Sequence, residues 1–152
     1  MAYLRKFVNV NNNPKNKKSC DCVIRALITT LNLDTETIIK DLTQIYLTKG
    51  WFLTDKKCYS KYLETKGYIM NKQPKKFDNT KYTAEEFCEY LNKNKYIKGT
   101  VMAHVGGHHV STFVNTGTEK NRDYRIYDIW DCSLKCVGNY WIKSIPFTVK
   151  EV

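Results

Sequence analysis

Two cysteines lie where a polar, lysine-rich segment runs into an amphipathic one, in "NPKNKKSCDCVIRALITTL". Cys22 follows Asp21, a residue type that often begins a helix. A thiol in the first turn of a helix faces unpaired backbone N–H groups and the positive end of the helix dipole, which lower its pKa. Cys22 is therefore a candidate nucleophile, with a small buried apolar residue as the alternative. Cys20 is interpreted as a bystander on the approach loop.

A cysteine nucleophile needs a base, and the base needs a group that orients it. All three histidines lie in "AHVGGHHVSTFV", where His109, with His108 as the alternative, follows a Gly-Gly turn at the start of a predicted strand. Asp128 lies 19 residues beyond His109, enough for one strand, a turn and a returning strand. This hairpin can place the carboxylate beside the imidazole. Trp130 is expected on the same strand face as Asp128, shielding the pair from water.

A zinc site is a competing interpretation of the same residue types. Two cysteine pairs and two histidines offer ligands, namely Cys20, Cys22, Cys132, Cys136, His104 and His108. Neither pair has the Cys-x2-Cys spacing of structural zinc sites, so no metal and no other cofactor is expected. Six cysteines also leave disulfides open, although Cys58 and Cys88 are expected to be buried, reduced thiols on helix faces.

Together these motifs resemble the papain-like cysteine peptidases, in the order Cys, His, Asp on a helix followed by an antiparallel sheet. "CDCVIRA" is similar to the opening of the nucleophile helix, and especially to the Asp-Cys-x-x-Arg-Ala opening of small, mostly uncharacterised papain-like proteins of bacteria and their phages. "GHHVSTFVN" resembles the Gly-His strand that carries the base, and "YDIWD" the Asn/Asp-x-Trp segment that orients it. The resemblance implies a Cys22–His109–Asp128 triad covered by Trp130.

The resemblance also implies an oxyanion hole and a reaction. In papain-like peptidases an amide side chain six residues before the nucleophile helps to bind the oxyanion, and Asn16 has that position here, beside the backbone N–H of Cys22. The implied chemistry is hydrolysis of a peptide or isopeptide bond, in a protein or peptide substrate, through a thioester. Amidases, deamidases and acyltransferases use the same machinery, and the motifs do not separate them. Residues 32–98 carry no family motif.

The elements that must position these residues follow from apolar spacing and turn signals. Helices are predicted over residues 21–32, 34–50, 55–67 and 83–94, with Asp21 as the first N-cap and Thr83 and Glu86 as a capping box. A short strand is predicted within 3–10, and strands over 99–105, 109–115, 123–130 and 135–142. The prediction is one α+β domain, residues 1–152, whose nucleophile helix packs on a C-terminal antiparallel sheet in the papain-like manner.

Composition narrows the classes of protein. The chain of 152 residues has a net charge of +10, but its lysines are scattered and no nucleic-acid-binding motif accompanies them, so a solvated surface is favoured over nucleic-acid binding. No apolar run is long enough to cross a membrane and no signal peptide is recognised, so a cytoplasmic protein of a bacterium or a phage-infected host is expected. A non-catalytic effector or inhibitor that binds a protein partner is the alternative function, and the oligomeric state is left open.

Overall fold

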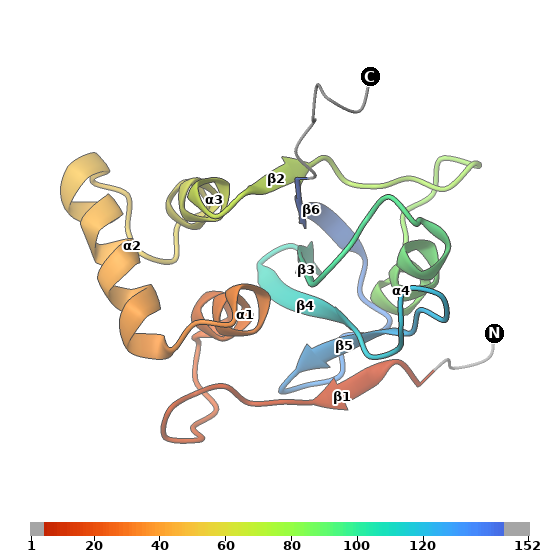
Figure 1. The fold of residues 1–152 in the computed structure, drawn as a ribbon, viewed down its shortest axis with the longest axis horizontal. Coiled ribbons are helices and arrows are strands. Elements are labelled where there is room, and N and C mark those ends of the chain that lie inside the picture. The colour runs from red at the N-terminus through yellow and green to blue at the C-terminus, as the bar shows by residue number, and fades with distance from the viewer. Residues whose placement is uncertain (1–4, 145–152) are drawn as a thin grey trace.

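The computed structural model describes residues 5–144. The helices within this range are α1 (Cys22–Leu31), α2 (Thr35–Lys49), α3 (Lys56–Thr65) and α4 (Ala84–Lys93). The strands are β1 (Phe7–Asn9), β2 (Tyr68–Asn71), β3 (Val101–Val105), β4 (His109–Asn115), β5 (Tyr124–Asp128) and β6 (Val137–Lys143) (Figure 1). The α+β prediction is confirmed: helices that are mostly N-terminal pack on a mixed, mostly antiparallel sheet. No helix among these residues combines the length and the apolar character needed to cross a bilayer.

Side-chain caps set where three of the helices begin. Asp34, Asp55 and Thr83 precede α2, α3 and α4, and each side chain accepts a hydrogen bond from a backbone N–H of the first turn. Thr83 and Glu86 form the predicted capping box. Gly50 ends α2 with a left-handed φ of 76° and donates its N–H to a carbonyl of the last turn. These helices therefore lie where the cap and stop signals predicted them.

The six strands form one sheet in the order β1-β5-β4-β3-β6-β2. Two features differ from the predicted antiparallel sheet. β1 pairs with β5 in parallel, and β2 extends the opposite edge by pairing with β6, in a segment where no strand is predicted. Both pairings join parts of the chain that are far apart in sequence, and both edge strands are only three or four residues long. Local periodicity is a weak signal for such strands.

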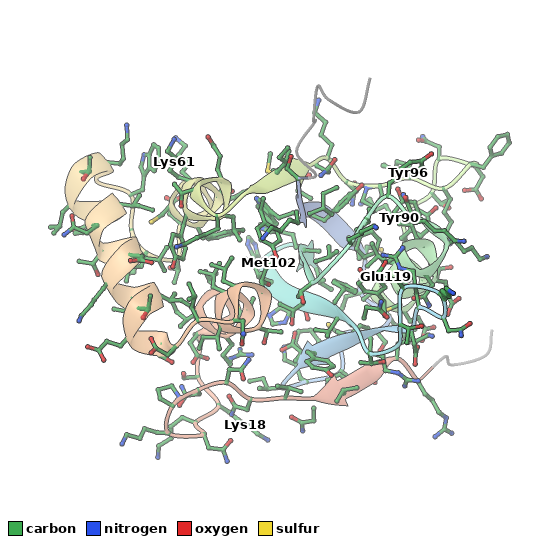
Figure 2. All side chains as sticks on the ribbon, viewed as in Figure 1. Lys18, Lys61, Tyr90, Tyr96, Met102 and Glu119 are labelled. Carbon is green, nitrogen blue, oxygen red and sulfur yellow. The ribbon has the colours of Figure 1, made fainter. Side chains whose placement is uncertain are left out.

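Helices cover both faces of this sheet (Figure 1). Successive residues of β3 alternate between two cores: Met102 packs with α1, α2 and α3, while Val101 and Ala103 pack with α4. Figure 2 labels Met102 between the sheet and α1, and Tyr90 on the opposite side, beside α4. α1 packs on β4 through its buried residues Val23 and Leu27. This packing brings the first turn of α1 to the beginning of β4.

Candidate active site

The predicted base and its orienting carboxylate are in direct contact. In the antiparallel β4–β5 pair Thr112 lies opposite Tyr127, so Asp128 lies level with Ser111. His109 is two residues before Ser111 on β4 and is therefore a diagonal neighbour of Asp128. Asp128 Oδ2 lies 2.5 Å from His109 Nε2. Asp128 is only 3% exposed, so little water competes for this hydrogen bond. The carboxylate therefore fixes the orientation of the imidazole ring.

The third predicted residue, Cys22, is the first residue of α1, and its thiol lies beside the His109 ring and the backbone N–H of Val110. Because Nε2 faces Asp128, Nδ1 is the ring nitrogen that remains for the thiol. Burial alone would raise the pKa of Cys22, but the neighbouring His109 ring, the Val110 backbone N–H and the Arg25 charge lower it overall. Burial would likewise lower the pKa of His109, yet the neighbouring Asp128 and Cys22 raise that pKa to about 9. The arrangement favours a thiolate–imidazolium pair.

Asp21 has the N-cap position of α1, as predicted, but its side chain does not cap the helix. Asp21 Oδ1 instead accepts a hydrogen bond from Arg25 Nε at 2.7 Å, and Oδ2 accepts one from Asn13 Nδ2 at 2.8 Å. The cap prediction was therefore right about the position and wrong about the bond. The first-turn N–H groups of α1 receive no side-chain cap, which leaves them oriented toward negative charge that develops near Cys22.

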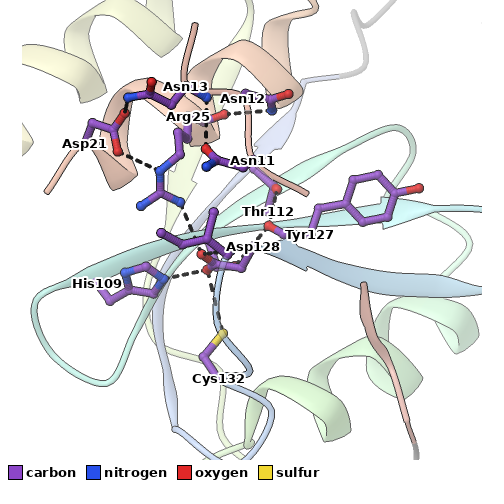
Figure 3. A network of polar contacts seen from close by, with 12 residues as sticks. Asn11, Asn12, Asn13, Asp21, Arg25, His109, Thr112, Tyr127, Asp128 and Cys132 are labelled. Atoms are coloured by element: carbon purple, nitrogen blue, oxygen red, sulfur yellow. Dashed lines mark hydrogen bonds and ion pairs between the residues drawn. The ribbon is translucent and has the colours of Figure 1, made fainter. Parts of the chain in front are cut away.

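Arg25 joins Asp21 to the base-orienting carboxylate, as Figure 3 shows. Its Nη1 lies 3.3 Å from Asp128 Oδ1, and only 8% of its side chain is exposed. The guanidinium is thus a buried cation between two carboxylates. Arg25 belongs to the Asp-Cys-x-x-Arg-Ala motif, but the sequence alone assigns it no role. The signal that was available is the spacing of four residues from Asp21, which lets the two side chains meet on one helix face.

The remaining neighbours of Asp128 come from its own strand end and from β4. Oδ1 accepts the backbone N–H of Ile129 at 2.8 Å and Cys132 Sγ lies 3.9 Å from Oδ2. The Ser111 hydroxyl lies nearby and donates to the Tyr127 carbonyl. Burial would raise the pKa of Asp128, but the neighbouring His109 and Ser111 side chains lower it. Burial raises the pKa of Cys132 to about 12, so this thiol remains protonated. Sequence reasoning did not anticipate Ser111 or Cys132 as neighbours.

His109, Asp128 and Cys132 also form a group of potential metal ligands among residues 5–144, with the ligand atoms within 4.8 Å of one another. It is not the combination considered from the sequence, because Cys20 and Cys136 are exposed and belong to no such group. The oxygens of Asp128 already accept hydrogen bonds from Arg25 and from the backbone N–H of Ile129. The donors therefore fit a hydrogen-bonded triad better than a metal centre.

Three consecutive asparagines hold the loop before α1 in place. Asn13 Oδ1 accepts the backbone N–H groups of Lys15 and Lys17, and Asn11 Nδ2 bonds the Lys17 carbonyl. Asn16 is exposed, has a left-handed φ of 55°, and does not line the cleft beside Cys22. The loop residues that do line it are Lys18, Ser19 and Cys20. The oxyanion-hole role of Asn16 stays a prediction.

The other predicted residues divide between the cleft and the core. Trp130 lies in a bend beyond the end of β5, not on the strand face that was predicted, but its ring contacts His109 with the centroids 4.8 Å apart. His108 is exposed in the β3–β4 turn and lines the cleft. His104 is half-buried against Trp141 and hydrogen-bonds the Tyr59 hydroxyl. Of the three histidines, His109 is the one that contacts Asp128 and Cys22.

The contacting pair opens into a cleft of about 720 Å³. Cys22 and His109 both line it, and Val23, Ile129 and Trp130 contribute apolar surface. This volume is in the range of sites that hold a small molecule or a few residues of a peptide. A nucleophile, its base and space for a substrate therefore meet at one place.

Comparison with known proteins identifies no relative of this chain. No protein-family model matches the chain, and neither the curated proteins nor the solved structures contain a significant match. The assignment of a function consequently depends on the residues of the site and on their geometry.

Proposed function

We propose that this protein is a thiol-dependent hydrolase of the papain-like kind, which cleaves a peptide or isopeptide bond through a thioester intermediate. The observation that carries the proposal is the placement of the Cys22 thiol beside the His109 ring, which hydrogen-bonds the buried Asp128 carboxylate, at the edge of an open cleft. Nucleophile, base and orienting group are the three parts that cysteine acyl-transfer chemistry requires.

In the proposed reaction the Cys22 thiolate attacks the carbonyl carbon of the scissile bond. The oxyanion that forms lies near the uncapped first turn of α1, where the backbone N–H of Cys22 can donate to it. Protonated His109 then gives its proton to the leaving amine, and the thioester remains on Cys22. A water molecule, deprotonated by His109, attacks the thioester and releases the acid. Asp128 orients the ring and stabilises its charge throughout.

The proposal can be tested without knowing the natural substrate, by using the activated ester p-nitrophenyl acetate. We expect a burst of p-nitrophenol, one acetyl group on Cys22 by mass spectrometry, and turnover that is lost in both Cys22→Ser and His109→Gln. Cys20→Ser is the matched control, since Cys20 is an exposed thiol two residues away, and it should react as the unaltered protein does. Acetylation of Cys20 or of lysines with Cys22 left untouched would favour a non-catalytic binding protein with this fold.

A further inference from the structure

The cleft beside Cys22 differs in charge from two other large clefts of the molecule. No Asp or Glu occurs among its lining residues, whereas the clefts along α4 and between α3 and β2 each have two carboxylates in their linings. Lys18 and Lys135 line it from two different loops, and Arg25 also belongs to its lining. The surface that faces a substrate is therefore positive as well as partly apolar.

The carboxylates closest in sequence to this lining have partners elsewhere. Asp21 and Asp128 bond Arg25, and Asp55 caps α3 by accepting the backbone N–H of Lys57. Asp131, which follows Trp130, accepts the backbone N–H of Ser133. The lysines that form ion pairs with carboxylates among residues 5–144 are Lys6, Lys40, Lys61 and Lys76. The ammonium groups of Lys18 and Lys135 are thus available to a ligand.

Lys135 is also held in position by its surroundings. The β3–β4 turn is tied to the Lys135 loop by a hydrogen bond from the Gly106 N–H to the Cys136 carbonyl, at 2.9 Å. A side-chain carbon added at Gly106 would lie 3.5–3.7 Å from the Cβ, Cγ and Cδ atoms of Lys135, so the apolar stem of the lysine lies along the glycine backbone. Such packing restricts the stem while the charged end stays in water.

We propose that the substrate is an acidic peptide segment, which places a carboxylate side chain within a residue or two of the scissile bond. Lys18 and Lys135 are the specificity residues that meet this carboxylate, and the apolar wall at Ile129 and Trp130 takes a neighbouring part of the chain. This inference rests on the proposed function, because it assumes that Cys22 attacks a carbonyl in this cleft.

The test compares two alkylating agents that differ in charge, anionic iodoacetate and neutral iodoacetamide. The measured quantity is the rate constant for iodoacetate divided by that for iodoacetamide. At low ionic strength we expect this ratio to be higher at Cys22 than for 2-mercaptoethanol. It should fall about tenfold in Lys18→Gln/Lys135→Gln, about threefold for each lysine. Lys93→Gln/Lys95→Gln is the matched control, because it removes the same charge at the end of α4, on the other side of the sheet. Its ratio should equal that of the unaltered protein.

A peptide probe tests the substrate class more directly. Inactivation by an acyl-dipeptidyl fluoromethyl ketone with aspartate next to the reactive group should be faster than with asparagine there, and the preference should vanish in Lys18→Gln/Lys135→Gln. Fast reaction of Cys22 that is indifferent to charge, or unchanged in the double variant, would overturn the acidic-substrate inference and leave the proposed hydrolase standing. A Cys22 that reacts no faster than buried Cys58 with neutral iodoacetamide would refute both.

Discussion

Replacing Arg25 by methionine removes the cation that lies between Asp21 and Asp128 while keeping most of the apolar volume. The Arg25 side chain is 8% exposed and that of Asp128 is 1% exposed, so the variant leaves a buried carboxylate without this partner. Removing one partner of a buried ion pair typically costs about 3–5 kcal/mol. Asp128 keeps His109, the Ile129 N–H and the Cys132 thiol as donors, so we expect the free energy of unfolding to fall by about 2–4 kcal/mol.

Arg125 supplies a matched control, because it also pairs with an aspartate, Asp123, at 2.9 Å, but both side chains are about one-third exposed. Arg125→Met should cost less than about 1 kcal/mol, as exposed ion pairs do. Arg25→Lys, which keeps a charge but loses the forked donor geometry, should fall between the two methionine variants. Urea unfolding followed by tryptophan fluorescence and by circular dichroism measures all three.

The same variant should alter the site, because the Arg25 charge helps to lower the pKa of Cys22. In Arg25→Met the thiolate absorbance of Cys22 should therefore appear at higher pH than in the unaltered protein. A double-mutant cycle with Asp21→Asn should show coupling, since that change removes one of the two carboxylates that Arg25 neutralises. A destabilisation no larger than that of Arg125→Met, with an unshifted Cys22 titration, would refute the role given to Arg25.

Three further predictions follow from the same contacts. Asp128→Asn should lower the pKa of His109 from about 9, because the carboxylate that raises it is gone; an NMR titration of the ring with an unchanged midpoint would contradict this. In Cys22→Ala the free energy of unfolding should fall by about 1–2 kcal/mol as pH rises from 7 to 9. The reason is that the pKa of His109 is higher in the folded than in the unfolded protein, so over this range only the folded protein still loses the proton. The unaltered protein should change less, because deprotonation of Cys22 on folding offsets proton uptake by His109; parallel urea titrations test this. Cys88 and Cys132, whose pKa values burial raises, should resist iodoacetamide at neutral pH until urea unfolds the chain, as mass spectrometry can show.

The fold was predictable where the signal is local. Asp34, Gly50 and the Thr83–Glu86 capping box satisfy backbone groups of neighbouring residues, so their sequence positions alone locate α2 and α4. The β3–β4 hairpin follows from the Gly-Gly turn in the same way. The short β2 and the parallel β1 depend on partners that are distant in sequence, and such pairing is decided by tertiary packing.

The candidate site was predictable to a different degree for each residue. Cys22, His109 and Asp128 carry chemical types whose order is informative, and the structure brings all three into contact. Arg25 looks like an ordinary polar helix residue until the end of β5, 103 residues away in sequence, supplies its second carboxylate. Asp21 accepts a hydrogen bond from Arg25 instead of capping α1. This choice of partner depends on where the Asp21 side chain is held, which the sequence alone does not specify.

The ionisation of Cys22 tests the central claim most directly. Rates of iodoacetamide alkylation of Cys22 and of exposed Cys20 should be measured by mass spectrometry as a function of pH, in the unaltered protein and in His109→Gln. If the thiol is paired with His109, Cys22 should react as a thiolate below the ordinary cysteine pKa of 9.0 and faster than Cys20, and His109→Gln should abolish that advantage. Equal pH profiles for Cys20 and Cys22, or a Cys22 profile that His109→Gln leaves unchanged, would contradict the thiolate–imidazolium pair and the hydrolase proposed from it.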